Sequence, residues 1–151
     1  FEARHDLHDA RRVAARLGVP HYIVNFEREF NAHVVSNFVS EYAAGRTPIP
    51  CVHCNGDLKF ATLAARAEGF GADAVATGHY ARVERDATTG RYLLKRGRDA
   101  AKDQSYFLFT LTQAQLAHAA FPVGALDKQA VRAHARALDL PVVLFVGLRL
   151  G

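Results

Sequence analysis

The chain has 151 residues, half of them hydrophobic, with a net charge of +4 and a pI near 9.3. This length allows one buried core, and no apolar run approaches the roughly 20 residues of a membrane span. Two cysteines do not make the disulfide framework of a small secreted domain, and Phe1 does not open a signal-peptide pattern. We therefore expect a cytoplasmic protein without a membrane partner. Its positive charge favours a polyanionic ligand.

Apolar residues at helical spacing predict two helices in the first third of the chain. The first covers residues 7–17 and ends at Gly18, and the second covers residues 30–42 and ends at Gly45. The intervening segment HYIVNF, residues 21–26, has the composition of a strand.

The middle of the chain predicts a helix, a buried strand and a hairpin. The helix starts after the proposed cap Asn55 and ends near Gly69. Residues 73–77 form a short apolar run of buried-strand type, and two β-rich runs flank a turn at residues 86–90. Residues 106–109 suit either a strand or a helix entry. Two further helices are predicted over residues 113–120 and 127–138.

Strands that alternate with long helices predict an α/β fold with a parallel sheet, and no linker divides the chain. Ligands of such sheets bind beyond the carboxyl ends of the strands. Gly78 stands directly after the strand at 73–77, where it would let a ligand approach the backbone. The alternative is that Gly78 only relaxes a tight turn.

The segment TPIPCVHCNGDLKF, residues 47–60, holds both cysteines in a C-x-x-C spacing. Cys54 immediately precedes the cap Asn55, so the positive end of the helix dipole, together with nearby Arg46 and His53, favours its thiolate form. Cys54 is therefore the better candidate nucleophile. A zinc site, a thioredoxin-type redox pair and inert buried cysteines are the alternatives, although the chain shows no further ligand motif for a metal.

Three motifs, GRTPIPCVHCNGDLKF, ADAVATGHYAR and KDQSYFL, occur in this order and closely resemble the tRNA-specific 2-thiouridylase family. The resemblance implies a Rossmann-like adenine nucleotide alpha hydrolase domain, also called a PP-loop ATPase domain. It implies an enzyme, a sulfurtransferase that adenylates the wobble uridine of tRNA and transfers persulfide sulfur to C2, in 5-methylaminomethyl-2-thiouridine synthesis. The expected cofactor is ATP with Mg²⁺. The expected partners are tRNA and a sulfur-relay donor protein or cysteine desulfurase.

The resemblance also assigns roles to matching positions. Cys54 would be the nucleophilic cysteine, Gly78 would contact ATP, and His79 would contact tRNA. The target base would meet Ile49, Pro50 and Cys51, and tRNA would also meet Lys102, Asp103 and Gln104. Each assignment has a purely structural alternative. His79 could be a strand-end histidine satisfied by backbone hydrogen bonds, and Asp103 and Gln104 could be cap or surface residues.

The chain departs from the family pattern in three ways. The glycine- and serine-rich pyrophosphate loop is absent, Ile49 replaces a common asparagine, and the apolar tail VVLFVGLRLG lacks the second cysteine. We therefore expect a single partial domain over residues 1–151, inactive alone. In it, residues 1–82 are the remainder of the nucleotide-binding α/β domain. Residues 83–151 form a hairpin and helical region that contacts tRNA.

Two other functions stay open. A related ATP-dependent RNA thiolase would act on another base, and a non-catalytic module would bind zinc or RNA through the C-x-x-C. Arg96 and Arg98, near Lys102, either contact phosphates or form a solvated face.

Overall fold

The computed structural model describes residues 3–49, 60, 63, 66, 67, 69 and 71–140. They belong to two compact units. One unit combines Phe1–Val24 with Lys128–Gly151, and the other is Asn25–Asp127. No helix among the described residues is both long and apolar enough to cross a membrane.

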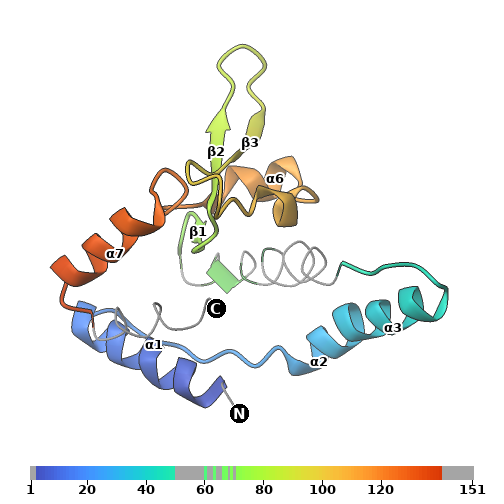
Figure 1. Ribbon diagram of the computed structural model, residues 1–151, viewed down its shortest axis with the longest axis horizontal. Helices are drawn as coiled ribbons and strands as arrows, with labels where there is room; N and C mark the ends of the chain where they lie inside the picture. The colour runs from blue at the N-terminus through green and yellow to red at the C-terminus, as the bar shows by residue number, and fades with distance from the viewer. Residues whose placement is uncertain are drawn as a thin grey trace. The chain divides into compact units, whose positions relative to one another are not determined.

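The first unit contains the helices α1, Ala3–Leu17, and α7, Lys128–Ala137 (Figure 1). Both confirm predicted helices. Gly18 ends α1 with a φ of 67°, a left-handed conformation that glycine adopts without a Cβ clash. Beyond α7, the Asp139 carboxylate lies 3.0 Å from a guanidinium nitrogen of Arg16, and this ion pair joins the two chain segments of the unit.

The second unit opens with a continuous helical stretch, as residues 30–42 predict. It consists of α2, Glu27–Phe30, a π-helical turn η1, Asn31–Val35, and α3, Ser36–Ala43. The Ser36 hydroxyl donates to the carbonyl of Asn31 at 2.9 Å within the widened turn. Gly45, with a φ of 72°, follows the end of α3.

The strand predicted at residues 21–26 is wrong, because this segment has no strand assignment before α2 begins. A strand is stabilised by hydrogen bonds to a neighbouring strand, and in the described part of the chain no strand pairs with these residues. Tyr22 and Ile23 are accordingly exposed. A composition typical of strands does not form a strand without a neighbouring strand to pair with.

The predicted helix from Asn55 to Gly69 lies largely outside the described residues. Five of its residues are described: Phe60 is π-helical, and Leu63, Arg66, Ala67 and Gly69 are α-helical. The guanidinium carbon of Arg66 lies 5.4 Å from the ring centre of Phe26, a cation–π distance.

A two-stranded parallel sheet confirms the predicted sheet type. It pairs β1, Val75–Ala76, with β4, Ala119–Ala120, so the strand predicted at 73–77 is present in shorter form. The helix predicted over 113–120 is wrong at its end, since α6 covers only Gln113–Ala117. Backbone hydrogen bonds across the ladder hold the alanines of β4 in a strand and override their helical preference.

The predicted hairpin is confirmed. Its strands are β2, Ala81–Arg85, and β3, Tyr92–Arg96, and they pair in antiparallel register (Figure 1). Asp86 organises the turn, because its carboxylate accepts from the Thr88 N–H and the Thr89 hydroxyl, both at 2.8 Å. These bonds lower the pKa of Asp86.

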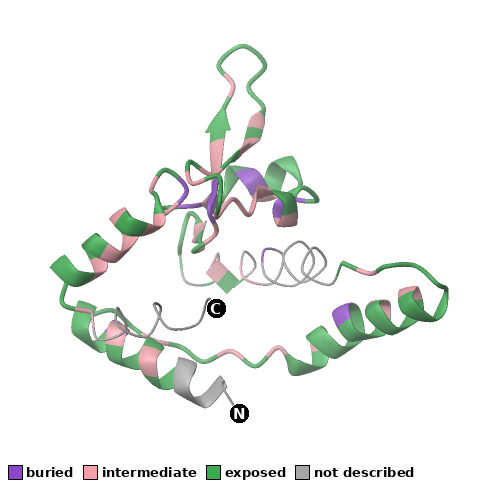
Figure 2. Cartoon of the chain, in the orientation of Figure 1, coloured by how far each residue is buried: buried purple, intermediate pink, exposed green. Residues whose placement is uncertain are grey.

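The core of this unit lies under the hairpin. Of residues 106–109, whose conformation the sequence leaves undecided, the first three lie in the 3₁₀ helix η3, Ser105–Leu108, and Leu108 is fully buried. Buried residues gather around the base of the hairpin, η3 and α6 (Figure 2). The buried cluster consists of Phe60, Ala81, Leu108, Leu111, Leu116, Ala119 and Phe121.

Candidate functional site

Two of the three sequence motifs come together at the base of the hairpin. The turn that contains Gly78 and His79 connects β1 to β2, and the loop with Lys102, Asp103 and Gln104 connects β3 to η3. Backbone and side-chain hydrogen bonds join this turn and this loop directly. The structure therefore brings five of the predicted site residues into one region.

Gly78 and His79 follow the end of β1, where ligands of parallel sheets bind. Gly78 is exposed, and a Cβ built on it would meet no atom within 4 Å. His79 is partly buried. Its Nδ1 lies 2.8 Å from the Thr77 hydroxyl, and its ring packs edge-on against Phe121 with 6.3 Å between ring centres. Thr77 and Phe121 thus fix the orientation of the imidazole.

Gln104 makes a reciprocal pair of hydrogen bonds with the backbone of Tyr80, the residue after His79. The Tyr80 N–H donates to the side-chain oxygen of Gln104 at 3.0 Å, and the Gln104 N–H donates to the Tyr80 carbonyl at 2.9 Å. Two bonds between the same residues restrain both segments more than either bond alone. Gln104 therefore fastens the loop to the histidine turn.

Two glycines let the backbone pack closely around the same segment. A Cβ on Gly97 would lie 2.6 Å from the Tyr80 carbonyl oxygen, and a Cβ on Gly124 would lie 1.6 Å from the Ala81 carbonyl oxygen. Both distances are shorter than van der Waals contact. Any side chain at these positions would push the start of β2 away from its neighbours.

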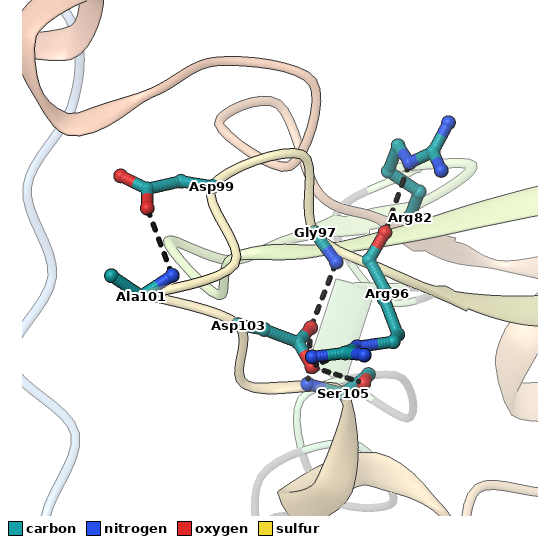
Figure 3. A network of polar contacts seen from close by, with 7 residues as sticks. All are labelled: Arg82, Arg96, Gly97, Asp99, Ala101, Asp103 and Ser105. Carbon is teal, nitrogen blue, oxygen red and sulfur yellow. Dashed lines mark hydrogen bonds and ion pairs between the residues drawn. The ribbon is translucent and has the colours of Figure 1, made fainter.

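Asp103 holds the loop together from inside (Figure 3). Its carboxylate accepts from the Gly97 N–H at 2.8 Å, from the Ser105 N–H at 3.3 Å and hydroxyl at 3.0 Å, and from Arg96 Nε at 3.2 Å. Only 13% of its side chain is exposed. A second aspartate, Asp99, accepts from the Ala101 N–H at 3.1 Å in the preceding turn.

The surroundings of Asp103 set its protonation. Burial, the largest single influence, acts to raise the pKa of Asp103, and hydrogen bonds from Gly97 and Ser105 act in the opposite direction. With the further bond from Arg96, the hydrogen bonds outweigh burial, and the pKa of Asp103 lies below its ordinary value. The carboxylate is therefore ionised throughout the neutral range.

Asp103→Asn should destabilise the protein by about 1 to 3 kcal/mol at neutral pH, because the amide nitrogen would face donors that now meet an oxygen. A lowered pKa in the folded state gives stability that is complete well above the unfolded pKa of about 3.9 and is lost as pH falls through the lower folded value. We expect the difference in unfolding free energy between wild type and Asp103→Asn to be constant above about pH 5 and to shrink below it. Urea unfolding between pH 3 and pH 7 measures this, and a difference independent of pH would contradict the role of the ionised carboxylate.

The hairpin beside this region is basic, with six basic residues against two acidic ones between positions 81 and 98. Glu84 is already neutralised, since it pairs with Lys95 and lies 3.4 Å from Arg82. The hydrogen bond from Lys95 lowers the pKa of Glu84. Arg98 and Lys102 form no ion pair with any other residue that the structure describes. Positive charge therefore remains available at the base of the hairpin.

Most of the cysteine motif lies outside the residues that the structure describes. Pro50, Cys51 and Cys54 lie outside the described residues, and of their neighbours Ile49 is described and is 39% exposed. Across the described ranges, no group of three or more histidine, cysteine or acidic side chains is placed to hold a metal ion. The role of Cys54 as the nucleophile and the contacts of Ile49, Pro50 and Cys51 with the target nucleobase stay predictions.

Sequence reasoning missed three residues that shape this region. Gly97 and Gly124 carry the closest backbone approaches, and Thr77 orients His79. A glycine inside KRGRD and another inside PVGAL were visible signals, but their meaning depends on a partner strand that is distant in sequence. Thr77 contacts His79 only two positions further on, but the residue types alone do not predict this hydrogen bond.

Comparisons with known proteins agree on one family. The family model described as "tRNA methyl transferase HUP domain" matches residues 2–144. The chain is 60% identical over 137 residues to the tRNA-specific 2-thiouridylase MnmA of Geotalea uraniireducens, 57% identical over 137 residues to that of Solibacter usitatus, and 52% identical over 134 residues to that of Heliobacterium modesticaldum.

These alignments cover 91%, 91% and 89% of this chain, and 36%, 37% and 35% of the three relatives respectively. The chain therefore spans about a third of the length of the curated relatives that it matches. The resemblance that the three motifs indicate and the α/β fold class are both confirmed.

Proposed function

Since the chain belongs to the family of the tRNA methyl transferase HUP domain, we propose that it is part of a tRNA-specific 2-thiouridylase that places sulfur on C2 of the wobble uridine. The observation that carries this proposal is the identity of 60% over 137 residues to a relative of that name. The family description names methyl transfer, whereas the relatives cited above are all named thiouridylases. The relatives carry the proposal, because each alignment covers about nine tenths of this chain.

Cys54 is the proposed nucleophilic cysteine. Its position next to the helix start predicts a sulfur that is anionic near neutral pH, and thiolates are strong nucleophiles. Pro48 and Pro50 stiffen the loop before it. Ile49, Pro50 and Cys51 would meet the target base, so that sulfur and base are held in register.

ATP is the proposed nucleotide, with Mg²⁺, and when bound it supplies the group that makes the C2 oxygen of uridine able to leave. The residues fit such a ligand at Gly78, because this glycine is exposed and the space above its Cα is open to 4 Å. A side chain at this position would occupy that space. Gly78 would therefore let the nucleotide reach the backbone at the end of β1.

His79 and the loop of Lys102, Asp103 and Gln104 form the proposed tRNA-contacting part of the site. Thr77 and Phe121 hold the imidazole in one orientation, and the Gln104 bridge keeps the loop beside it. The net charge of the hairpin favours a polyanion at this edge. The sulfur would come from a relay protein or a cysteine desulfurase.

The full-length protein that contains this chain, purified from its own cells, should transfer sulfur to tRNA only when ATP is present. The assay supplies unmodified tRNA, Mg²⁺–ATP and a persulfide donor, and nucleoside mass spectrometry then identifies the product. We expect 2-thiouridine at the wobble position. Sulfur at another base would point to a related RNA thiolase, and a methylated base without sulfur would overturn the proposal in favour of the chemistry in the family description.

A further inference from the structure

We infer that Asp103 serves tRNA recognition as a positioning residue, whereas Gln104 both fastens the loop to Tyr80 and, together with Lys102, presents side-chain hydrogen-bond donors to the RNA backbone. The inference rests on the proposed function, and it assigns different tasks to three residues that sequence resemblance treats alike. The donors are the ammonium of Lys102 and the amide N–H groups of Gln104.

The orientation of the Gln104 amide follows from its partner. A backbone N–H can only donate, so the Gln104 atom that meets the Tyr80 N–H must be the oxygen. The amide nitrogen then points away from Tyr80. No described residue accepts a hydrogen bond from this nitrogen, and the side chain is only partly buried. Gln104 therefore presents the two N–H donors of its amide nitrogen on the side away from Tyr80.

Asp103 has no carboxylate oxygen free of an internal bond. Both oxygens accept from within the loop, and 13% of the side chain is exposed. Its charge lies beside that of Arg96. A phosphate would therefore meet neither an exposed anion nor an available acceptor at this position. Asp103 supports recognition by folding the loop from Gly97 to Ser105.

Lys102 stands immediately before these two residues. Its backbone N–H donates to the Asp99 carbonyl at 3.0 Å, which fixes the start of the loop, while its ammonium has no ion-pair partner among the described residues. The Lys102 ammonium and the Gln104 amide NH₂, two positions apart in the sequence, are both donor groups. Phosphate oxygens accept hydrogen bonds and do not donate them, so the RNA backbone fits this edge better than a base edge does.

Gln104→Glu is the sharpest test of the donor edge. The glutamate keeps an oxygen for the Tyr80 N–H but replaces the outward donors by a charged acceptor. We expect tRNA binding to weaken about tenfold at unchanged thermal stability. The matched control is Gln115→Glu, because the side-chain oxygen of Gln115 also accepts from a backbone N–H, that of Thr112 at 2.9 Å, and the substitution changes the charge equally. That control should bind tRNA within about twofold of wild type.

Two further measurements separate contact from positioning. Lys102→Ala should reduce the slope of log affinity against log salt by about 1, while Asp103→Asn should leave this slope unchanged. If Gln104 positions His79, then Gln104→Ala should weaken binding less in a His79→Ala background than in wild type. All variants are compared at a temperature well below unfolding, so that loss of the fold is not mistaken for loss of binding.

Normal tRNA binding by Gln104→Glu, an unchanged salt slope for Lys102→Ala, or full additivity with His79→Ala would each overturn the inference. These failures differ from a failure of the proposed function. If wild type makes 2-thiouridine and Gln104→Glu still binds normally, only the inference falls. If wild type neither binds tRNA nor transfers sulfur, the proposed function falls and the inference falls with it.

Discussion

Cys54→Ser should reduce the 2-thiouridine content of tRNA to the level of cells that lack the protein. A serine hydroxyl is far less nucleophilic than a thiolate at neutral pH and cannot accept or pass on persulfide sulfur, so the reaction loses its sulfur chemistry entirely. The substitution changes one atom, and we expect tRNA affinity to stay within about twofold of wild type. Complementation followed by nucleoside mass spectrometry measures the first quantity, and filter binding measures the second.

Cys51→Ser is the matched control, since it removes the other thiol of the C-x-x-C. The helix start that the sequence predicts at Asn55, directly after Cys54, leads us to expect that the two variants differ, with Cys54→Ser the more severe. Wild-type levels of 2-thiouridine in the Cys54→Ser strain would remove this cysteine from the mechanism. If both variants lost the fold and bound one zinc less per chain, the metal-binding module would gain support instead.

Gly124→Ala should destabilise the protein by on the order of 3 kcal/mol and lower its melting temperature by about 10 °C. The reason is steric. The new Cβ would lie 1.6 Å from the carbonyl oxygen of Ala81, a backbone atom at the start of β2 that cannot rotate away. Relief requires the segment after Phe121 or the base of the hairpin to move, and the buried cluster holds both.

Gly78→Ala is the control for this prediction, because its Cβ would meet nothing within 4 Å. Its unfolding free energy should stay within about 0.5 kcal/mol of wild type. Thermal unfolding of the two variants by circular dichroism makes the comparison. Equal melting temperatures for Gly124→Ala and wild type would mean that the close approach between Gly124 and Ala81 is not a feature of the folded protein.

Local signals in the sequence predicted the elements whose causes are local. The glycines at 18 and 45 end helices because each adopts a positive φ, a property visible from the residue type and its place after an apolar period. The prediction of the hairpin followed from two β-rich runs separated by a turn that extends from Asp86 to Gly90. Each of these predictions depends on residues within one turn or one strand.

Elements that depend on distant partners were predicted less well. Residues 21–26 have strand composition but no strand beside them in the described part of the chain, and residues 119–120 leave a helical pattern because β1 pairs with them. Alternation and propensity do not encode such neighbours.

The site divides in the same way. Motif resemblance selected the residues near position 79 and near position 103, but it did not predict that Gln104 bridges to Tyr80. It also did not distinguish the internal carboxylate of Asp103 from the ammonium of Lys102, which has no ion-pair partner among the described residues. The Gln104 bond joins residues 24 positions apart, which no local pattern reports, whereas the Asp103 bonds span two to seven positions within one irregular loop.

The most direct test of the central claim is nucleoside mass spectrometry of total tRNA from cells in which the gene is deleted. The account predicts that 2-thiouridine disappears from the wobble position and returns when the wild-type gene is restored. Unchanged 2-thiouridine in the deletion strain, with no second gene able to supply the activity, would contradict it.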